Sequence, residues 1–453
     1  MADSTHSSDS PNSADVIVIG AGAAGLAAAV DLRRAGLSVL ILEARDRIGG
    51  RIFTQRDPAL QLPIALGAEF IHGLSPEIFQ PLQAKQIPIT EVSGDSWCFQ
   101  NGGLCRCDFF GEVDEILQQM DPDRPDESFL SFLNRTITAN SAPQERSAAQ
   151  WTLSYVSGFN AADVEKVGAH WLIREMVAEE KIDGERAFRS QHGYSDLIEI
   201  FRQNLKQLEI DLCMGAVVNS INWKAGHVEV VAKINDQERR FAAKRALITV
   251  PLGVLKTPAK RMGAISFNPA LPASKHQALE KLAMGKVFRV VLHFRHRFWD
   301  DLKSPIEGTT LSNMSFLFSH DEWFPTWWTT MPEKLPIITG WAPDRCADRF
   351  VGQRRDFVID RAIQTLSRLL SLNPVFPASL LEAAYFHDWQ ADPFSRGVYS
   401  YGMVGSDGAQ ETLAAPIDGT LFFAGEATAT GQTGTVHGAL ASGQRAASQI
   451  ASQ

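Results

Sequence analysis

Residues 15–45 read DVIVIGAGAAGLAAAVDLRRAGLSVLILEAR, and this stretch decides the expected fold. DVIVI is a short β-branched run typical of a buried parallel strand, and GAGAAG follows it directly. LAAAVDLRRAG predicts a helix that ends at Gly36, and SVLILEA predicts a second strand. A strand, a helix and a strand over about thirty residues form a β-α-β unit.

The glycines of this unit are spaced for binding a dinucleotide. Gly20 permits the tight turn out of the strand, Gly22 lets the backbone approach a pyrophosphate, and Gly25 lets helix and strand pack closely. The phosphates then lie at the helix N-terminus, where free N–H groups and the helix dipole favour negative charge. Glu43 ends the second strand, where its carboxylate can accept both ribose hydroxyls. These features predict a dinucleotide site but do not decide between NAD and FAD.

Length, charge and cysteine content narrow the class of protein. A chain of 453 residues is too long for one hydrophobic core, so two domains are expected. The net charge of −9 argues against a nucleic-acid partner, because phosphate binding needs a basic face. No apolar run is long enough to span a bilayer. Residues 1–13 are polar and are expected to be a disordered leader. A cytoplasmic location is therefore predicted. Cys98, Cys105 and Cys107 lie close together without a second cluster of metal-ligand spacing, so we expect reduced thiols and no metal.

The chain also contains EARDRIGGR at 43–51, TVPLGVL at 249–255, FAGEAT at 423–428 and TVHGA at 435–439. These four segments resemble the FAD-dependent amine oxidase superfamily, and the likeness covers nearly the whole chain from residue 15 onward. EARDRIGGR at 43–51 resembles the segment in which a glycine pair approaches the cofactor and an arginine, here Arg51, pairs with its pyrophosphate. FAGEAT at 423–428 resembles the second FAD motif, whose acidic residue, here Glu426, binds the ribityl chain or pyrophosphate region. TVHGA at 435–439 is similar to the helix start under the flavin in polyamine oxidases and lysine-specific histone demethylases, and TVPLGVL at 249–255 matches these families too.

This resemblance implies FAD as the cofactor. Val218 falls where a family valine contacts the adenine, and Val398 stands where monoamine oxidases carry the cysteine that bonds to FAD, so FAD is expected to be non-covalent. The candidate FAD-binding residues are Gly20, Gly22, Ala24, Gly25, Glu43, Ala44, Arg45, Gly50, Arg51, Gly67, Ala68, Val218, Pro251, Trp389, Gly425, Glu426, Thr435 and Val436. For Arg45 and Arg47, an arginine-rich surface loop is the alternative.

The same resemblance implies an α/β fold with discontinuous domains. A Rossmann-like FAD-binding domain of the glutathione reductase type is expected over residues 14–90, 190–260 and 380–453. An α+β substrate-binding domain is expected over residues 91–189 and 261–379. Within the latter, VFRVVLHFRHRFW shows the period-two alternation of a strand, and residues 356–372 show the pattern of an amphipathic helix.

Aromatic residues are expected in front of the flavin. SRGVY at 395–399 resembles the loop that supplies one ring of an aromatic cage, so Tyr399 is a candidate aromatic wall. Thr435 stands where monoamine oxidases place the second ring. Trp389, Trp327 or Trp328 can replace that ring, although the Trp327–Trp328 pair is equally consistent with core packing.

The sequence departs from the family at the lysine that hydrogen-bonds to flavin N5 through water. Residues 284–291 (MGKVFRVV) align with the strand that carries it, and Arg289 falls on that position. Arginine keeps the charge but cannot act as a base, so hydride transfer is expected to survive while a fast reaction with oxygen is not implied. Lys286 lies three residues earlier, which points it to the other face of the strand.

The clearest indication of the substrate is GAEFIHG at 67–73. It is similar to a polyamine oxidase loop in which a His or Glu at the His72 position lies near the substrate amine. Glu69 can add a carboxylate for a second cationic nitrogen; alternatively, both side chains only hydrogen-bond the loop or the flavin. Amino acid oxidases of this superfamily place an arginine in the corresponding loop. The sequence has none between Arg56 and Arg106, although an arginine from elsewhere could fold in.

The expected function is therefore FAD-dependent oxidation of the C–N bond of a polyamine or a bulky primary or secondary amine, with O2 or another electron acceptor. The candidate catalytic residues are Arg289, Tyr399, His72 and Glu69. An L-amino acid oxidase is the alternative enzyme, and a flavin-binding scaffold or sensor is the non-enzymatic alternative. No nucleic-acid or membrane partner is expected, and the oligomeric state is open.

Overall fold

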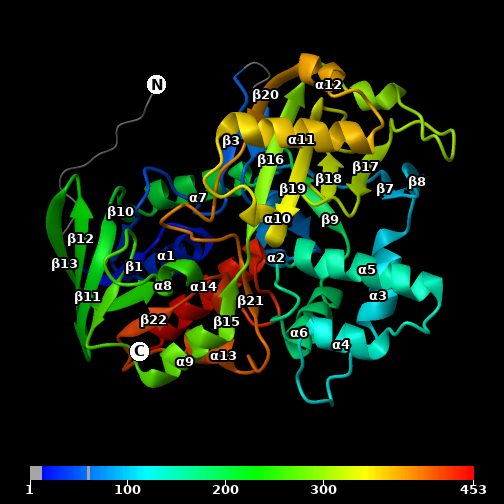
Figure 1. The fold of residues 1–453 in the computed structure, drawn as a ribbon. Coiled ribbons are helices and arrows are strands. Elements are labelled where there is room, and N and C mark those ends of the chain that lie inside the picture. The colour runs from blue at the N-terminus through cyan, green and yellow to red at the C-terminus, as the bar shows by residue number, and fades with distance from the viewer. Residues whose placement is uncertain (1–12, 59–61) are drawn as a thin grey trace.

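The structure is a computed structural model that describes residues 13–58 and 62–453. Two lobes are each built around one large β-sheet, and the chain passes between them several times (Figure 1). The predicted leader, residues 1–13, lies outside the described residues except for Ser13, which begins strand β1.

The first lobe holds the predicted β-α-β unit in an eight-stranded mixed sheet. Its order is β10-β2-β1-β13-β12-β11-β14, with β22 paired to β13. The strands are β1 Ser13–Ile19, β2 Val39–Leu42, β10 Asp211–Cys213, β11 Val217–Lys224, β12 His227–Ile234, β13 Gln237–Ile248, β14 Ser266–Asn268 and β22 Leu421–Phe423. β1, β2, β10, β13 and β22 run parallel, so their carboxyl ends meet at one edge. Such an edge is where nucleotides bind in open α/β sheets.

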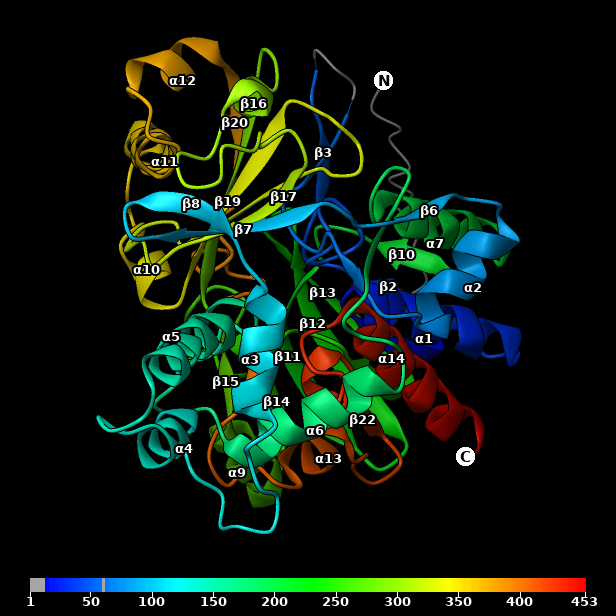
Figure 2. The same cartoon turned by 90° about the vertical axis from the view of Figure 1, so that its right-hand side faces the viewer.

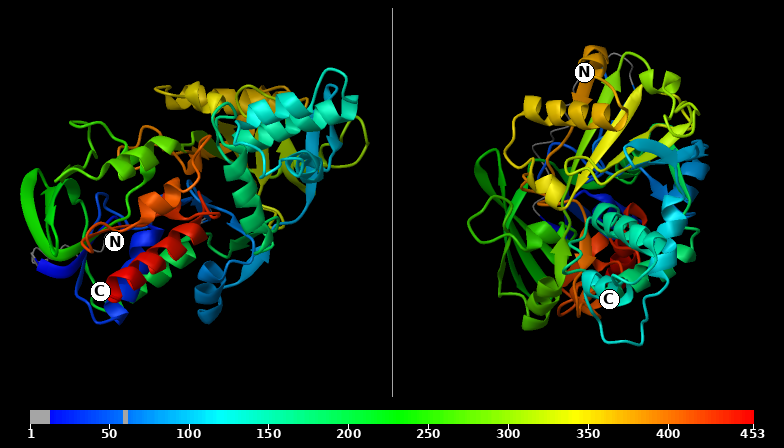
Figure 3. Two further views of the ribbon diagram at one scale, coloured as in Figure 1. Left: turned by 90° about the horizontal axis from the view of Figure 1, so that it is seen from below. Right: turned by 45° about the vertical axis from the view of Figure 1, so that its right-hand side comes forward.

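Two helices from opposite ends of the chain lie side by side on this sheet. They are α1 Ala23–Arg34 and α14 Val436–Ala451, seen together in Figure 3. A Cβ atom on Gly443 would lie 2.2 Å from the Ala24 carbonyl oxygen, so only glycine permits this approach. The close contact joins the first and last segments of the chain into one nucleotide-binding lobe.

The second lobe contains a seven-stranded sheet in the order β20-β16-β19-β18-β17-β7-β8. Its strands are β7 Asp95–Gln100, β8 Gly103–Arg106, β16 Val287–Phe294, β17 Met314–Phe318, β18 Thr326–Thr329, β19 Ile337–Pro343 and β20 Leu381–Tyr385. Helix α11 Arg355–Leu369 lies across this sheet, and helices α3 Phe109–Leu117, α4 Phe129–Thr136, α5 Pro143–Gly158 and α6 Ala169–Glu180 gather at one end of it (Figure 2).

The alternation seen in strand β16 separates two buried faces. All eight of its residues are buried. Phe288, Val290 and Leu292 pack into the aromatic core under α11, while Arg289 and His293 point to the other face and meet buried polar partners. A half-exposed strand would show the same alternation, so the pattern alone does not reveal that Arg289 is enclosed.

Shorter elements connect the two sheets. The helices are α2 Pro76–Ala84, α7 Ser195–Gln207, α8 Leu252–Leu255, α9 Ala273–Lys281, α10 Arg345–Asp348, α12 Val375–Leu380, α13 Ala409–Ala414, η1 Phe298–Asp301 and η2 Glu426–Thr428. The strands are β3 Thr54–Arg56, β4 Pro63–Ala65, β5 Ile71–His72, β6 Ile89–Glu91, β9 Ala187–Ser190, β15 Leu282–Met284 and β21 Ser400–Gly402. Strand β14 belongs to the first sheet although it follows residue 260, and β20 belongs to the second sheet although it follows residue 379. The domain boundaries stay a prediction.

The cysteines differ from the expectation of reduced thiols. Cys98 and Cys107 form a disulfide, with 5.8 Å between their Cα atoms, so the prediction is wrong for this pair. The antiparallel pairing of β7 with β8 folds the chain back on itself and brings Cys107, just beyond β8, next to Cys98. Cys105 stays a thiol.

The described residues contain neither a helix suited to cross a membrane nor a cluster suited to hold a metal ion. No helix within residues 13–58 and 62–453 has the length and apolar character needed to cross a bilayer. Over the same ranges, no group of three or more His, Cys, Asp or Glu side chains is arranged to hold a metal ion. The cytoplasmic location stays a prediction.

Candidate active site

The turn between β1 and α1 leaves an open approach to the helix N-terminus. Gly20 has a φ of +104°, and a Cβ on Gly25 would lie 2.0 Å from the Gly20 carbonyl oxygen, so both positions need glycine. Gly22 is the N-cap of α1 and gives it no side-chain hydrogen bond. Apart from Gly22 itself and its neighbours in the chain, no described atom lies within 4 Å of the point where a Gly22 Cβ would stand. An anion can therefore approach the free N–H groups of the first turn.

Glu43 is buried at the end of β2 and held by the backbone. Its Oε2 accepts a hydrogen bond from Ala21 N at 2.7 Å, and its Oε1 accepts one from Arg45 N at 2.9 Å. Burial raises the pKa of Glu43, against these two hydrogen bonds and the neighbouring arginines. Each carboxylate oxygen has a further lone pair, so the side chain can still accept a hydroxyl group.

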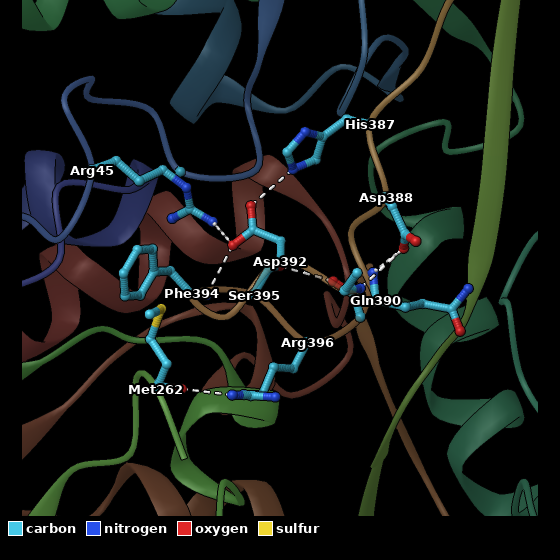
Figure 4. A network of polar contacts seen from close by, with 12 residues as sticks. Arg45, Met262, His387, Asp388, Gln390, Asp392, Phe394, Ser395 and Arg396 are labelled. Atoms are coloured by element: carbon cyan, nitrogen blue, oxygen red, sulfur yellow. Dashed lines mark hydrogen bonds and ion pairs between the residues drawn. The ribbon is translucent and has the colours of Figure 1, made fainter. Parts of the chain in front are cut away.

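Arg45 lies in a buried polar network and not on a surface loop. Its Nη2 donates to Asp392 Oδ1 at 2.8 Å, and His387 Nε2 lies 2.8 Å from Asp392 Oδ2. Figure 4 shows Asp392 between Arg45 and His387. Burial raises the pKa of Asp392, but His387 and Arg45 lower it by more, so the carboxylate is charged. The network ties the loop after β20 to the motif after β2.

Arg51 and Glu426 connect the two FAD-like motifs directly. Arg51 Nη1 donates to Glu426 Oε1 at 2.9 Å and to the Val398 carbonyl oxygen at 2.7 Å. The second carboxylate oxygen of Glu426 accepts from Ser400 Oγ at 2.7 Å and from Gly434 N at 3.1 Å. Gly50 beside Arg51 has a φ of +58° and sits against Gly22. Residues 50–51, 398–400 and 426 therefore meet at one point.

Further candidate cofactor residues surround this point. A small cavity is lined by Arg51, Pro251, Gly425 and Glu426 together with apolar side chains. A Cβ on Gly67 would lie 1.9 Å from the Arg51 carbonyl oxygen, and Ala68 N donates to that oxygen at 3.2 Å.

Other candidates have contacts of a more structural kind. Trp389 is buried, and its Nε1 donates to the Leu66 carbonyl oxygen at 2.8 Å. Thr435 caps α14 by accepting from Gly438 N at 2.9 Å, and Val436 is the first residue of that helix. Val218 is buried in β11 among the apolar side chains of the first sheet. Ala44 is half-buried after β2, and Ala24 packs against α14. Their roles toward a cofactor stay predictions.

Glu69 is held by two arginines and a tryptophan. Arg189 Nε donates to its Oε1 at 2.9 Å, Arg289 Nη2 donates to its Oε2, and Trp328 Nε1 lies 3.2 Å from that oxygen. Burial raises the pKa of Glu69, but the charges of Arg289 and Arg189 lower it by more, so the net shift is downward. These contacts favour the alternative in which Glu69 stabilises the loop, because its carboxylate is already paired.

The two adjacent tryptophans play different parts because they point to opposite faces of β18. Trp327 is fully buried in the aromatic core, and its Nε1 donates to the Phe324 carbonyl oxygen at 2.9 Å. Trp328 faces Glu69, and the Arg289 guanidinium lies 5.2 Å from its ring centroid. Lys286 lies on the surface, where its Nζ donates to Asp348 at 2.9 Å.

His72, on strand β5, lies among aromatic rings. The Phe159 ring meets it edge-on at 5.2 Å between centroids, and Tyr155 stacks on Phe159 at 5.0 Å. Tyr399 joins this group, because its hydroxyl donates to the Phe159 carbonyl oxygen at 2.7 Å. Burial lowers the pKa of His72 to about 4 and raises the pKa of both tyrosines, so all three side chains are neutral at pH 7.

Two carboxyl groups of α6, the buried Glu175 and the half-buried Glu179, were not identified from the sequence. Burial raises the pKa of Glu175 to about 8, and its carboxyl group accepts hydrogen bonds from Thr433 N and Oγ1 at 2.9 and 2.7 Å. Burial and, secondly, Asp114 raise the pKa of Glu179 to about 7. Within the described ranges, the Glu179 carboxylate has no hydrogen bond or ion pair, and its charge acts on Tyr155. A helical pattern alone gives no sign that these acids turn inward.

The fold and this set of contacts define an FAD-type oxidoreductase, and comparison with known proteins specifies the family. Residues 106–451 match the model of the flavin-containing amine oxidoreductases, and residues 18–84 match that of an NAD(P)-binding Rossmann-like domain. The chain belongs to the family of flavin-containing amine oxidoreductases. The predictions of this superfamily, of an α/β fold with a Rossmann-like domain, and of FAD are confirmed.

Relatives cover almost the whole chain. Polyamine oxidase 2 of Arabidopsis thaliana is 28 % identical over 96 % of this chain and 87 % of its own length. Lysine-specific histone demethylase 1 homolog 3 of the same plant is also 28 % identical over 96 % of this chain, which spans only 30 % of that relative. A solved structure of putrescine oxidase bound to putrescine superposes with a TM-score of 0.79 at 21 % identity, covering 97 % of this chain and 99 % of its own.

The residues present fit FAD. The open space over Gly22, the uncapped N-terminus of α1 and the buried Glu43 provide for a pyrophosphate and a ribose. At the other end, Arg289 Nε is buried without a hydrogen-bond partner among the described residues, which indicates that a further acceptor belongs beside it.

Proposed function

We propose that this chain oxidises the C–N bond of a polyamine or a bulky primary or secondary amine. The imine product hydrolyses to an aldehyde or ketone, and O2 is reduced to H2O2. FAD, when bound, would supply the hydride acceptor, while the protein supplies orientation and electrostatics. The observation that carries the proposal is the neutral aromatic group of His72, Phe159, Tyr155 and Tyr399 beside the FAD-binding segments.

An uncharged group of this kind suits the chemistry of amine oxidation. An amine gives up a hydride only in its neutral form, because the nitrogen lone pair stabilises the developing positive charge. A site without a fixed anion at the reacting carbon does not favour the ammonium form over the neutral amine. His72, with a pKa of about 4, adds no positive charge that would repel the substrate and no negative charge that would hold its proton.

Glu179 supports a substrate with a second nitrogen. Its carboxylate has no ion pair within the described part of the chain and lies near enough to Tyr155 to raise the pKa of that residue. A second ammonium group, carried on an apolar chain past the aromatic rings, would supply the missing partner. Glu179 thereby takes the role that the sequence suggested for Glu69.

The arginine contacts count against an amino acid substrate. The side chains of Arg289 and Arg189, which contact the 67–73 loop, both donate to Glu69. Releasing either one to bind a substrate carboxylate would break a buried ion pair, which costs about 3–5 kcal/mol.

The test is an anaerobic titration of the yellow holoenzyme with spermidine, benzylamine and several L-amino acids. We expect bleaching near ~450 nm, typical of flavins, with spermidine and not with the amino acids. Bleaching by amino acids alone would establish the alternative oxidase. Absence of bleaching by any of these compounds, with FAD bound, would contradict an amine-oxidising function and favour a flavin-binding scaffold. Admission of air with detection of H2O2 then tests the electron acceptor.

A further inference from the structure

Glu69, Arg289 and Arg189 form one buried charged group, which we name the RER cluster. Glu69 follows β4, Arg289 lies on β16 and Arg189 on β9, so three separate elements build it. The side chains are 12, 7 and 17 % exposed, respectively. Arg189 also donates to the carbonyl oxygens of Met331 and Thr329 at 2.9 and 3.2 Å.

The RER cluster carries an excess positive charge. Two guanidinium groups share a single carboxylate, and no second carboxylate contacts either arginine in the described ranges. Arginine stays protonated under ordinary conditions even where burial lowers the pKa, as it does for Arg289. The net formal charge is therefore positive by one unit in a poorly solvated place. An unbalanced buried charge is costly unless a ligand with complementary charge lies next to it.

One donor of the RER cluster is unused. Arg289 Nη1 donates to the Gly67 carbonyl oxygen at 2.9 Å and Nη2 donates to Glu69, but the buried Nε has no partner in the described structure. A buried donor that is left without an acceptor destabilises the fold. Gly67 in turn contacts the Arg51 backbone, so the cluster is attached to the segment that holds the cofactor.

We propose that the RER cluster acts on the flavin as a unit: Arg289 donates its Nε–H to the flavin ring, and the excess positive charge raises the reduction potential of bound FAD. In this arrangement Glu69 and Arg189 are positioning residues, which fix the orientation and net charge of Arg289. The inference rests on the FAD binding of the proposed function but not on the identity of the substrate. Electrons added to the flavin are stabilised by a nearby cation, so the reduced form gains more than the oxidised form.

The cluster predicts opposite effects for two neighbouring substitutions. Arg189→Gln removes the excess charge and should lower the equilibrium constant for flavin reduction by on the order of tenfold, which is about 30 mV for a two-electron couple. Glu69→Gln leaves both cations uncompensated and should raise it by a similar factor. If the three residues were merely structural, both substitutions would loosen the same site and would not move the potential in opposite directions.

The experiment measures the potential of the FAD-loaded enzyme against a reference dye, without oxygen and without substrate. Arg189→Lys should restore the wild-type value, because it keeps the charge. Lys286→Gln is the matched control, since it removes a cation just before the same strand at the surface pair with Asp348, and should leave the potential unchanged.

Shifts of Arg189→Gln and Glu69→Gln in the same direction, or no shift in variants that retain FAD, would overturn the inference. If Glu69→Gln loses FAD, the two Arg189 variants test the inference. A lower potential in Arg189→Gln but not in Arg189→Lys supports it, and equal potentials in the two variants overturn it. Because no amine is present, the potential can behave as expected even if the amine titration fails, so the two proposals fail separately.

Discussion

Arg51 and Glu426 are 375 positions apart in the chain, yet they form an ion pair with 2.9 Å between Nη1 and Oε1. The arginine belongs to the first FAD-like motif and the glutamate to the second. Glu426 is buried and is further held by Ser400 and Gly434. The pair therefore fixes the position of the arginine that we expect to meet the pyrophosphate.

Arg51→Met should weaken FAD binding roughly ten- to a hundredfold. A hydrogen bond to a charged group is worth about 1.5–3 kcal/mol, and each 1.4 kcal/mol is a factor of about ten in the dissociation constant. Titrating the apoprotein with FAD, followed by flavin fluorescence, measures this change. Arg349→Met removes an exposed pair with Glu322 and serves as the control. An unchanged FAD affinity in Arg51→Met would exclude Arg51 from phosphate binding.

Glu179→Gln should weaken spermidine binding about tenfold and leave benzylamine unaffected, because only spermidine carries a second ammonium group. Glu180→Gln is the matched control, since Glu180 is the next residue on α6 and is exposed. The dissociation constants come from the anaerobic bleaching titrations with each amine. Equal losses for both amines would show that Glu179 supports the site in general and does not bind a distal nitrogen.

Glu175→Gln should remove a pH dependence of stability. The pKa of Glu175 is raised from 4.5 to about 8 in the folded state, so the native protein binds more protons between these values. Its contribution to stability is complete below pH ~4.5 and is lost as the pH rises through about 8, at up to about 1.4 kcal/mol per pH unit. Gln mimics the protonated form and does not ionise.

Urea denaturation of the holoenzyme at several pH values measures this effect. As the pH is raised from 5 to 8, the urea concentration at the unfolding midpoint of the wild type should decrease relative to that of Glu175→Gln. The exposed Glu180→Gln should behave like the wild type. A constant difference between the wild type and Glu175→Gln over that range would show that Glu175 keeps an ordinary pKa.

Joint replacement of Cys98 and Cys107 by serine should lower the free energy of unfolding by about 2–3 kcal/mol, as expected for a short closed loop. The bridged residues are 9 positions apart. Alkylation of the denatured protein, followed by mass spectrometry, should modify two more cysteines after reduction than before. Equal numbers before and after reduction would show that the thiols are not bridged. Cys105→Ser is the control, because its thiol is outside the bridge.

The sequence predicts the features that depend on neighbours along the chain. Gly20, Gly22, Gly25 and Glu43 lie within one β-α-β unit, where local spacing sets their geometry, and the structure has the strand–helix–strand order that was expected. The family is likewise carried by short segments, so the superfamily and FAD could be predicted from motifs.

The contacts between distant elements could not be predicted. Arg189 has no motif, and its role depends on β9 lying beside the 67–73 loop. Because the sequence does not reveal this contact, it predicts that the Glu69 carboxylate can bind a substrate nitrogen. Glu179 faces inward because α6 shares a hydrophobic cluster with α3 and α5. The pairing of Cys98 with Cys107 depends on the hairpin between β7 and β8.

The parallel pairing of β13 with both β1 and β22 has a consequence for biosynthesis. The ribosome delivers β1 and α1 early, but β22 and α14 emerge about four hundred residues later. Until then, the hydrophobic face of α1 that packs on α14 is uncovered, and Arg51 has no Glu426 to pair with. Contacts of such long sequence separation form slowly and leave the nascent chain dependent on protection from aggregation. The ion pair between Arg51 and Glu426, which holds the arginine expected to meet the pyrophosphate, is therefore completed only after β22 has been synthesised.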